Sequence, residues 1–372
     1  MDADRFDRLR LIRSAQIGPV TFLQLLARFG TAGAALAALP DLAARGGGKA
    51  PRIAATDDVE REIAATRRLG AHYLFLGDPR YAPLLAEIEN PPPALIYKGD
   101  PDLMTRPCIG MVGARNASAA ACRFARMLAQ DLGKDGNASI VSGLARGIDT
   151  AAHQGSLAGG TIAVIAGGID IVFPPENADL QAQIAEQGLL LAEMPPGTRP
   201  QARHFPWRNR IIAGLSAGTV VVEAAPRSGS LITARLAAEA GREVMAVPGS
   251  PLDPRAQGCN LLIREGATLI QSAADVWEAI GPIDPRMVPQ GMVPQGMVRQ
   301  EGRGFDPAPV SPDVGEGERR AITGLLGPVP VPVDELVRQS AVVPALVQTV
   351  LLELELAGRL ERHAGGRVSL LG

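Results

Sequence analysis

Ile109-Gly110-Met111-Val112-Gly113-Ala114-Arg115 is the stretch that decides the fold. It is an apolar strand that ends in a glycine turn, and a segment of helical periodicity follows from Asn116. Short apolar runs and helical segments then alternate as far as residue 280. The expected strands are 108–112, 139–141, 161–165, 189–192, 219–222 and 243–247, and the expected helices are 117–132, 150–157, 178–186 and 231–240. Strands that are apolar throughout have both faces covered, so the sequence predicts an α/β, doubly wound, Rossmann-like parallel sheet.

Small and glycine-rich turns follow three of these strands, at the edge where such sheets bind ligands. Backbone N–H groups at a glycine turn and the positive end of the next helix suit an anion, and Asp149 is expected to cap the helix that starts at residue 150. The turns contribute these candidate phosphate-binding residues: Gly113 and Arg115; Ser142, Gly143, Arg146 and Gly147; Ser228, Gly229 and Ser230. Taken alone, the first turn is a weak motif, and the second is explained equally well by packing. None is a Walker A loop or a GxGxxG fingerprint, which disfavours P-loop nucleotide hydrolysis.

The segment 198–215 is locally basic. It contains no Asp or Glu, and Phe205 and Trp207 are interleaved with its cations. Its candidate anion-binding residues are Arg203, Arg208, Asn209 and Arg210. For a single arginine an internal ion pair is the better interpretation, but the cluster favours a basic surface on which bases can stack.

The composition sets outer limits on function. The chain has 372 residues, 46% of them hydrophobic, with 37 basic and 39 acidic residues and a net charge of −2. A polycationic class is therefore excluded, and any polyanion site must be local. The three cysteines lack metal-ligand spacing, which indicates small core residues. We expect a cytoplasmic protein without membrane insertion, because the sequence has neither an export signal nor a long apolar run.

Three further regions flank the expected sheet. Residues 1–80 predict short helices around an Ile17-Gly18-Pro19 turn, and the uncharged turn favours a packing domain over a phosphate-binding hairpin. The glycines at 46–48 are expected to loosen the chain. Residues 281–315 predict a mobile Pro/Gly-rich linker with a repeated Met-Val-Pro-Gln-Gly, between a sheet domain at 81–280 and a last domain at 316–372.

The last domain predicts three helices, 316–326, 333–339 and 344–357, followed by a hairpin, which is a winged-helix layout. The third helix contains Glu353 and Glu355 and no Lys or Arg, whereas Arg359, Arg362 and Arg367 lie in the hairpin. A helix that enters the major groove needs basic residues near phosphates. We therefore hypothesise that this domain contacts protein, or another copy of the chain, rather than reading DNA.

Catalytic patterns are sparse. His153 and His204 have no nucleophile motif beside them, and the sequence shows neither paired-carboxylate spacing nor a GxSxG elbow. Glu223 follows an apolar strand, where a helix cap or an arginine partner is a better interpretation than an active-site acid. We expect no catalytic residue, no metal and no cofactor.

Ordered motifs across the sheet domain make the sequence resemble the DprA/Smf family of DNA-processing proteins from bacterial natural transformation. The motifs are Tyr81-Ala82-Pro83-Leu84-Leu85, Val112-Gly113-Ala114-Arg115, Phe173-Pro174-Pro175-Glu176-Asn177, Phe205-Pro206-Trp207-Arg208-Asn209-Arg210 and Ser228-Gly229-Ser230-Leu231-Ile232-Thr233. The resemblance implies a SAM-like or helix-hairpin-helix N-terminal domain and a winged helix. By motif, it makes Arg115 the best phosphate ligand, with Arg208, Arg210 and the Gly143–Gly147 turn lining the same pocket. Ala114 stands where the family often has Ser.

The resemblance also implies function. It suggests a non-enzymatic recombination mediator that binds and protects incoming single-stranded DNA, assists RecA loading and forms a homodimer through the Rossmann-like domain. The alternative is a nucleotide-binding phosphoribohydrolase of the lysine-decarboxylase-like type. Those enzymes carry a Pro-Gly-Gly-x-Gly-Thr segment with a Glu, and the nearest stretch here, from Ala217 to Glu223, lacks the Pro-Gly-Gly. A third reading is a scaffold with a vestigial pocket.

Overall fold

The computed structural model describes residues 1–281, 314–363 and 365–371, and it divides into two compact units. One unit combines residues 1–61 with 299–372, and the other is 62–298. The expected linker at 281–315 lies almost wholly outside the described residues. In the described part of the chain no single helix is long and apolar enough to cross a membrane, although two sharply bent helix pairs pass the same test together.

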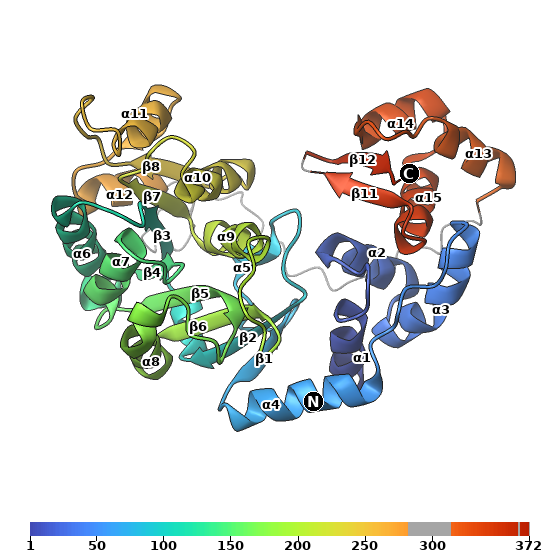
Figure 1. The fold of residues 1–372 in the computed structure, drawn as a ribbon, viewed down its shortest axis with the longest axis horizontal. Coiled ribbons are helices and arrows are strands. Elements are labelled where there is room, and N and C mark those ends of the chain that lie inside the picture. The colour runs from blue at the N-terminus through green and yellow to red at the C-terminus, as the bar shows by residue number, and fades with distance from the viewer. Residues whose placement is uncertain (282–313, 364, 372) are drawn as a thin grey trace, which may run out of the picture. The chain divides into compact units, whose positions relative to one another are not determined.

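The larger unit is built on a nine-stranded sheet in the order β1-β2-β6-β5-β4-β3-β7-β8-β9 (Figure 1). Its strands are β1 (His72–Phe75), β2 (Ala94–Gly99), β3 (Cys108–Gly113), β4 (Ser139–Ser142), β5 (Thr161–Gly168), β6 (Leu189–Met194), β7 (Gly218–Val222), β8 (Glu243–Ala246) and β9 (Thr268–Leu269). The strands from β6 to β9 in this order pair in parallel, which confirms the six expected strands. At the other edge β1 and β2 pair antiparallel, so the sheet is mixed and begins before the expected boundary at residue 80.

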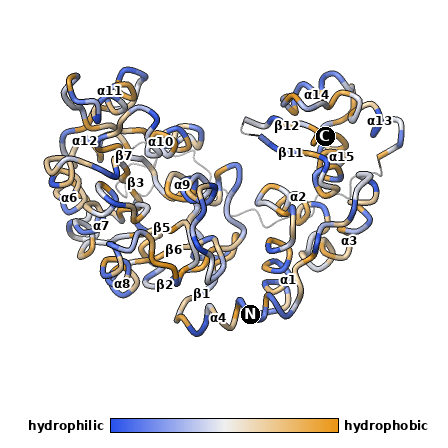
Figure 2. Tube along the Cα trace, in the orientation of Figure 1, coloured by the Kyte–Doolittle hydropathy of each residue, from blue (hydrophilic) through white to orange (hydrophobic). Residues whose placement is uncertain are grey.

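Helices cover both faces of the sheet, as the apolar strands predict. They are α5 (Pro83–Ala86), α6 (Ala119–Gly133), α7 (Ile148–Ser156), α8 (Ala178–Gln187), α9 (His204–Leu215), α10 (Gly229–Glu239), α11 (Gln257–Arg264) and α12 (Ala273–Ile280). Strand β3 shows why both layers are needed. Cys108 and Val112 pack toward α9 and α10, while Ile109 and Met111 pack toward α6 and α7. In Figure 2, hydrophobic residues, in orange, are frequent along these central strands.

The smaller unit joins the two ends of the chain. Its elements are α1 (Ala3–Ile12), α2 (Pro19–Phe29), α3 (Ala32–Arg45), α13 (Glu316–Gly324), β10 (Val331–Pro332), α14 (Val333–Ser340), α15 (Pro344–Leu356), β11 (Leu360–His363) and β12 (Arg367–Leu370). The last six form the expected winged helix. Helix α4 (Thr56–Arg68) leads from this unit into the sheet unit.

Candidate functional site

Two cavities lie at the carboxyl ends of β3, β4, β5 and β7, where the three expected turns come together. The first has a volume of about 240 Å³ and the second about 720 Å³. Arg115, Ala145, Phe205 and Arg208 line both, so the cavities adjoin along these four residues. This is the edge at which a doubly wound sheet binds ligands.

Arg208 is a buried cation where the cavities meet. It lies on α9, a helix that the periodicity of the sequence does not reveal, and 7% of its surface is exposed. Its guanidinium crosses Gly143 so closely that a Cβ there would lie 1.3 Å from Nη1. Burial lowers the pKa of Arg208 to about 10, with a contribution from the positive charge of Arg115, while Asp149 opposes the shift. Its Nε has no hydrogen-bond partner among the described residues, so the site holds donor capacity that the protein does not use.

Asp149 occupies the second glycine turn. Its Oδ2 accepts from the N–H groups of Gly143 at 3.1 Å and Ala145 at 3.3 Å. The expectation that Asp149 caps the following helix is wrong, because α7 begins at Ile148 with Gly147 at its N-cap. The N–H groups expected to hold an anion there already hold a carboxylate. Burial raises the pKa of Asp149, and Arg208 is the largest influence that lowers it.

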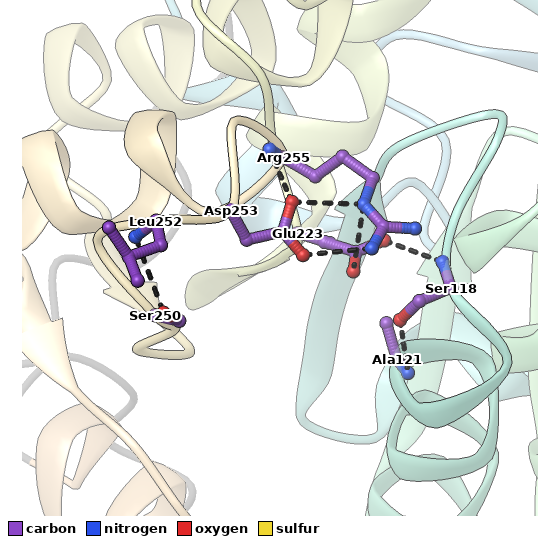
Figure 3. A network of polar contacts seen from close by, with 7 residues as sticks. All are labelled: Ser118, Ala121, Glu223, Ser250, Leu252, Asp253 and Arg255. Carbon is purple, nitrogen blue, oxygen red and sulfur yellow. Dashed lines mark hydrogen bonds and ion pairs between the residues drawn. The ribbon is translucent and has the colours of Figure 1, made fainter.

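A second carboxylate lies at the helix start that follows the first turn (Figure 3). The Glu223 carboxylate accepts from the Ser118 N–H at 2.7 Å, and Ser118 in turn caps α6 by accepting from Ala121. Glu223 also lies 3.9 Å from Arg255, which pairs with Asp253. The interpretation of Glu223 as a cap and arginine partner is confirmed. Glu223 thus already holds one N–H group at the start of α6 and places a negative charge there, so we assign the anion to Arg115 rather than to this helix end.

An aromatic wall stands beside the cations. The Arg115 guanidinium carbon lies 5.4 Å from the centroid of the Phe205 ring, a cation–π contact. Phe173 lies 5.8 Å from Phe205 and is 47% exposed. The rings and Pro174 and Pro175 line the smaller cavity with Arg146. A ligand that combines an anion with a flat apolar group fits both halves of this arrangement.

The third turn borders the larger cavity. Ser228 caps α10 and its hydroxyl lies 2.8 Å from that of Ser230. Arg227 adopts a left-handed backbone with φ of 66°, and it lines the cavity together with Arg255. Glu176 and Asp149 are the acids that line the two cavities, against five arginines.

The structure brings most of the candidate residues together. Those that line a cavity are Gly113, Arg115, Gly143, Arg146, Arg208, Asn209, Ser228, Gly229 and Ser230. Those outside both linings are Ser142, Gly147, Arg203 and Arg210. Arg210 is buried in an ion pair with Glu193, and the Ser142 hydroxyl donates to the Met111 carbonyl. Gly147 is needed for packing, since φ is 74° and a Cβ would lie 2.2 Å from the Ala114 oxygen. We remove Ser142, Gly147 and Arg210 from the proposed ligands on these contacts, and Arg203, which is exposed, for lack of a place in either lining.

Two phenylalanines and two arginines of the linings are not among the residues that the sequence predicts as ligands. Phe205 and Phe173 stood in quoted motifs, and the interleaving of Phe205 with arginines was its signal. Arg227 directly precedes the Ser228 turn, so its position carried a signal too. Arg255 is far from every turn in sequence, and only the fold brings it to the cavity.

Comparison with known proteins identifies the family. Residues 72–281 match the family described as DNA recombination-mediator protein A. Residues 2–65 match a DprA-like N-terminal HHH domain, and residues 306–366 match a DprA winged helix domain. The chain belongs to the DprA/Smf family. The resemblance seen in the motifs is thereby confirmed, and so is the fold class.

Individual DprA/Smf proteins agree with this assignment. Protein Smf of Synechocystis is 38% identical over 79% of this chain and 79% of its own length. DNA processing protein DprA of Bacillus subtilis is 45% identical over 59% of this chain and 75% of its own. The X-ray structure of DprA from Streptococcus pneumoniae covers 75% of this chain and 98% of its own with a TM-score of 0.62 and 36% identity. A DNA-processing, recombination-mediator role follows from family membership.

Proposed function

We propose that this chain binds single-stranded DNA in the two cavities, with phosphates at Arg115 and Arg208 and bases against Phe205 and Phe173. The carrying observation is the meeting of the two arginines and Phe205 along the shared wall of the cavities. The two positive guanidiniums repel each other, so an anion placed between them stabilises both. A phosphodiester with an adjacent base has the required combination of charge and flat apolar surface.

A solved relative supports this ligand. DprA from Helicobacter pylori is described by its single-stranded DNA-binding mode, and it covers 55% of this chain and 94% of its own, at 28% identity and a TM-score of 0.51. Because arginines contact phosphates and rings stack on any base, binding here is expected to be largely independent of sequence.

Such binding suits a recombination mediator that protects incoming single strands during natural transformation and assists RecA loading, without turnover of its own and in the cytoplasm.

A homodimer through the sheet unit is part of the same proposal. β9 ends the sheet, and Leu269 on it and Leu261 on α11 are 45% and 38% exposed, which suits a strand edge that pairs with a second copy. Leu269→Glu is expected to convert a dimer to a monomer in light scattering, and a monomeric wild type would contradict this part.

The ligand is tested by fluorescence anisotropy with labelled oligothymidine. Arg115→Ala is expected to weaken binding by about ten- to a hundredfold, because a hydrogen-bonded charge contributes roughly 1.5–3 kcal/mol. Arg126→Ala is the matched control. Arg126 is exposed on α6, bonds Gln154 and lines neither cavity, so its loss should change affinity less than twofold. Equal effects of the two variants would contradict the proposed site.

The enzymatic alternative has its own assay. A phosphoribohydrolase would release free base from a nucleoside monophosphate. We expect the wild type to release no more free base than Arg208→Ala does. If the wild type released base and Arg208→Ala did not, the hydrolase would replace the binding proposal.

A further inference from the structure

Helix α15 occupies the place of the recognition helix in the winged helix, yet beyond Pro344 and Ala345, which are exposed, it is buried almost all round. From Leu346 to Leu356 every residue is buried except Gln348 and Glu355, which are half-buried. A helix that reads DNA keeps one face open to enter the major groove. A helix that is covered on all sides is instead a core helix between two packed layers.

The two layers belong to opposite ends of the chain. One face of α15 carries Val347, Val350 and Leu354 into the core of the winged helix itself. The other carries Leu352 and Leu356 into the core of the N-terminal helices, whose members include Phe22, Leu25, Leu39 and Leu42.

Glycines in the N-terminal helices fit the approach of α15. A Cβ on Gly46 would lie 2.1 Å from the Glu353 carbonyl oxygen, and one on Gly48 would lie 2.3 Å from that of Ala357. Gly46 has φ of −72°, which any residue adopts, so its small size is needed for the contact and not for the turn. The expectation that this glycine run loosens the chain is wrong, because the run packs against the C-terminal end of α15.

Polar contacts surround the apolar interface. The Glu355 carboxylate accepts from the Thr21 hydroxyl at 2.9 Å and from Arg362 Nε at 2.8 Å. Arg362 also donates to Gln24, and Arg359 donates to the Gly46 carbonyl at 3.0 Å. These two arginines, which the sequence places in the hairpin, are therefore engaged by the N-terminal helices.

The same contacts cover the hairpin of the N-terminal domain. Thr21 lies in the first turn of α2, directly after the Ile17-Gly18-Pro19 turn through which such a hairpin would present N–H groups to a phosphate. A carboxylate, Glu355, is placed against that turn. Its negative charge opposes a phosphate there.

We infer that the N-terminal helices are the resident partner of the winged helix, and that the two domains cover each other's DNA-facing surfaces. Neither end of the chain is then free to bind duplex DNA. This inference stands on the contacts of the smaller unit and does not depend on the ligand of the cavities. The hypothesis that the winged helix contacts protein thereby becomes specific: its partner is residues 17–48 of the same chain.

Hydrogen exchange on the full chain tests the docking. In the wild type, α15 and α2 should be among the slowly exchanging segments. Gly46→Ala should speed exchange in both helices together, by tenfold or more, and leave β3 and β4 unchanged. Gly324→Ala is the matched control, since a Cβ there meets nothing within 4 Å, and it should change neither helix. Unaltered exchange of α15 in Gly46→Ala would overturn the inference.

A second variant removes contacts without adding volume and covers the case in which Gly46→Ala fails to fold. Arg359→Ala with Arg362→Ala should speed exchange in α2, while the affinity for a 20-base-pair duplex changes less than twofold. A tenfold loss of duplex affinity with unaltered exchange in α2 would show that these arginines serve DNA, and would overturn the inference.

Discussion

Arg208 illustrates how a single residue joins stability to function in this site. Its guanidinium is held over a glycine, near a buried carboxylate and beside a second arginine. Burying such a group costs free energy unless its charge and donors are satisfied. Asp149 offsets part of that cost through its charge, and the unused Nε leaves a further part that a bound phosphate would recover.

Gly143→Ala tests the placement of this guanidinium. The new Cβ would overlap Arg208 Nη1, and the flexible end of the arginine can move aside, so the fold should survive. Affinity for oligothymidine should fall about tenfold or more, because the displaced charge no longer faces the cavities. Gly317→Ala is the control, since Gly317 lines neither cavity and a Cβ there has nothing within 4 Å. Equal affinities in the two variants would contradict the assigned role of Arg208.

His153 predicts a pH dependence of stability. Burial, with a smaller contribution from Arg208, lowers its pKa from 6.5 to about 3, and its Nδ1 lies 2.7 Å from the Thr161 hydroxyl. Between these values the unfolded chain binds a proton that the native one does not, so stability falls as pH falls below 6.5, by about 1.4 kcal/mol per unit.

His153→Gln removes this titration. From pH 6.5 to 5.0 the wild type should lose about 2 kcal/mol more than the variant in urea unfolding, because other titrations are common to both. Parallel stability curves for the two proteins would show that His153 protonates normally in the fold.

At the scale of elements, carboxylates already accept from backbone N–H groups beside the ligand site. Glu223 accepts from the Ser118 N–H at the start of α6, and Asp149 accepts from the N–H groups of Gly143 and Ala145 in the second turn. The sequence shows the glycines and the helix starts, but it does not show that carboxylates from other positions occupy them. The arginines, not the helix ends, are therefore the anion ligands that we propose.

Glu223→Ala measures the contribution of one such carboxylate. The Ser118 N–H would lose its acceptor, at a cost of about 1–3 kcal/mol in the free energy of unfolding. Glutamate and alanine both carry a Cβ, so the left-handed backbone at position 223, with φ of 58°, costs the wild type and the variant about the same. Glu239→Ala, which removes an exposed ion pair with Arg235, should cost less than about 1 kcal/mol. If the two losses were equal, the carboxylate would not be a structural cap.

At the scale of the whole molecule, the sequence predicted what local patterns control. Apolar runs such as 108–112 and 161–165 indicated the parallel strands, and the winged helix followed from helical periodicity. Strand β1, with four residues, and helix α9, with Pro206 in its first turn, carry weaker patterns and were missed. The docking of Leu352 and Leu356 on residues 17–48 joins positions about 300 apart, so periodicity along the chain cannot reveal it. Arg210 shows the converse, because its motif suggested a ligand and its partner Glu193 was invisible until the chain folded.

The net charge of −2 makes the salt dependence of binding a measure of the local site. A protein that neutralises phosphates of a single strand loses affinity with a slope of about −0.7 in log K against log salt for each phosphate. Contacts from Arg115 and Arg208, and at most from Arg146 and Arg227, predict a slope between about −1.4 and −2.8. Arg115→Ala should make the slope shallower by about 0.7, whereas Arg126→Ala should leave it unaltered. A slope near zero would mean that the arginines of the cavities do not meet phosphates, and a slope that stays the same in Arg115→Ala would assign those phosphates to other residues.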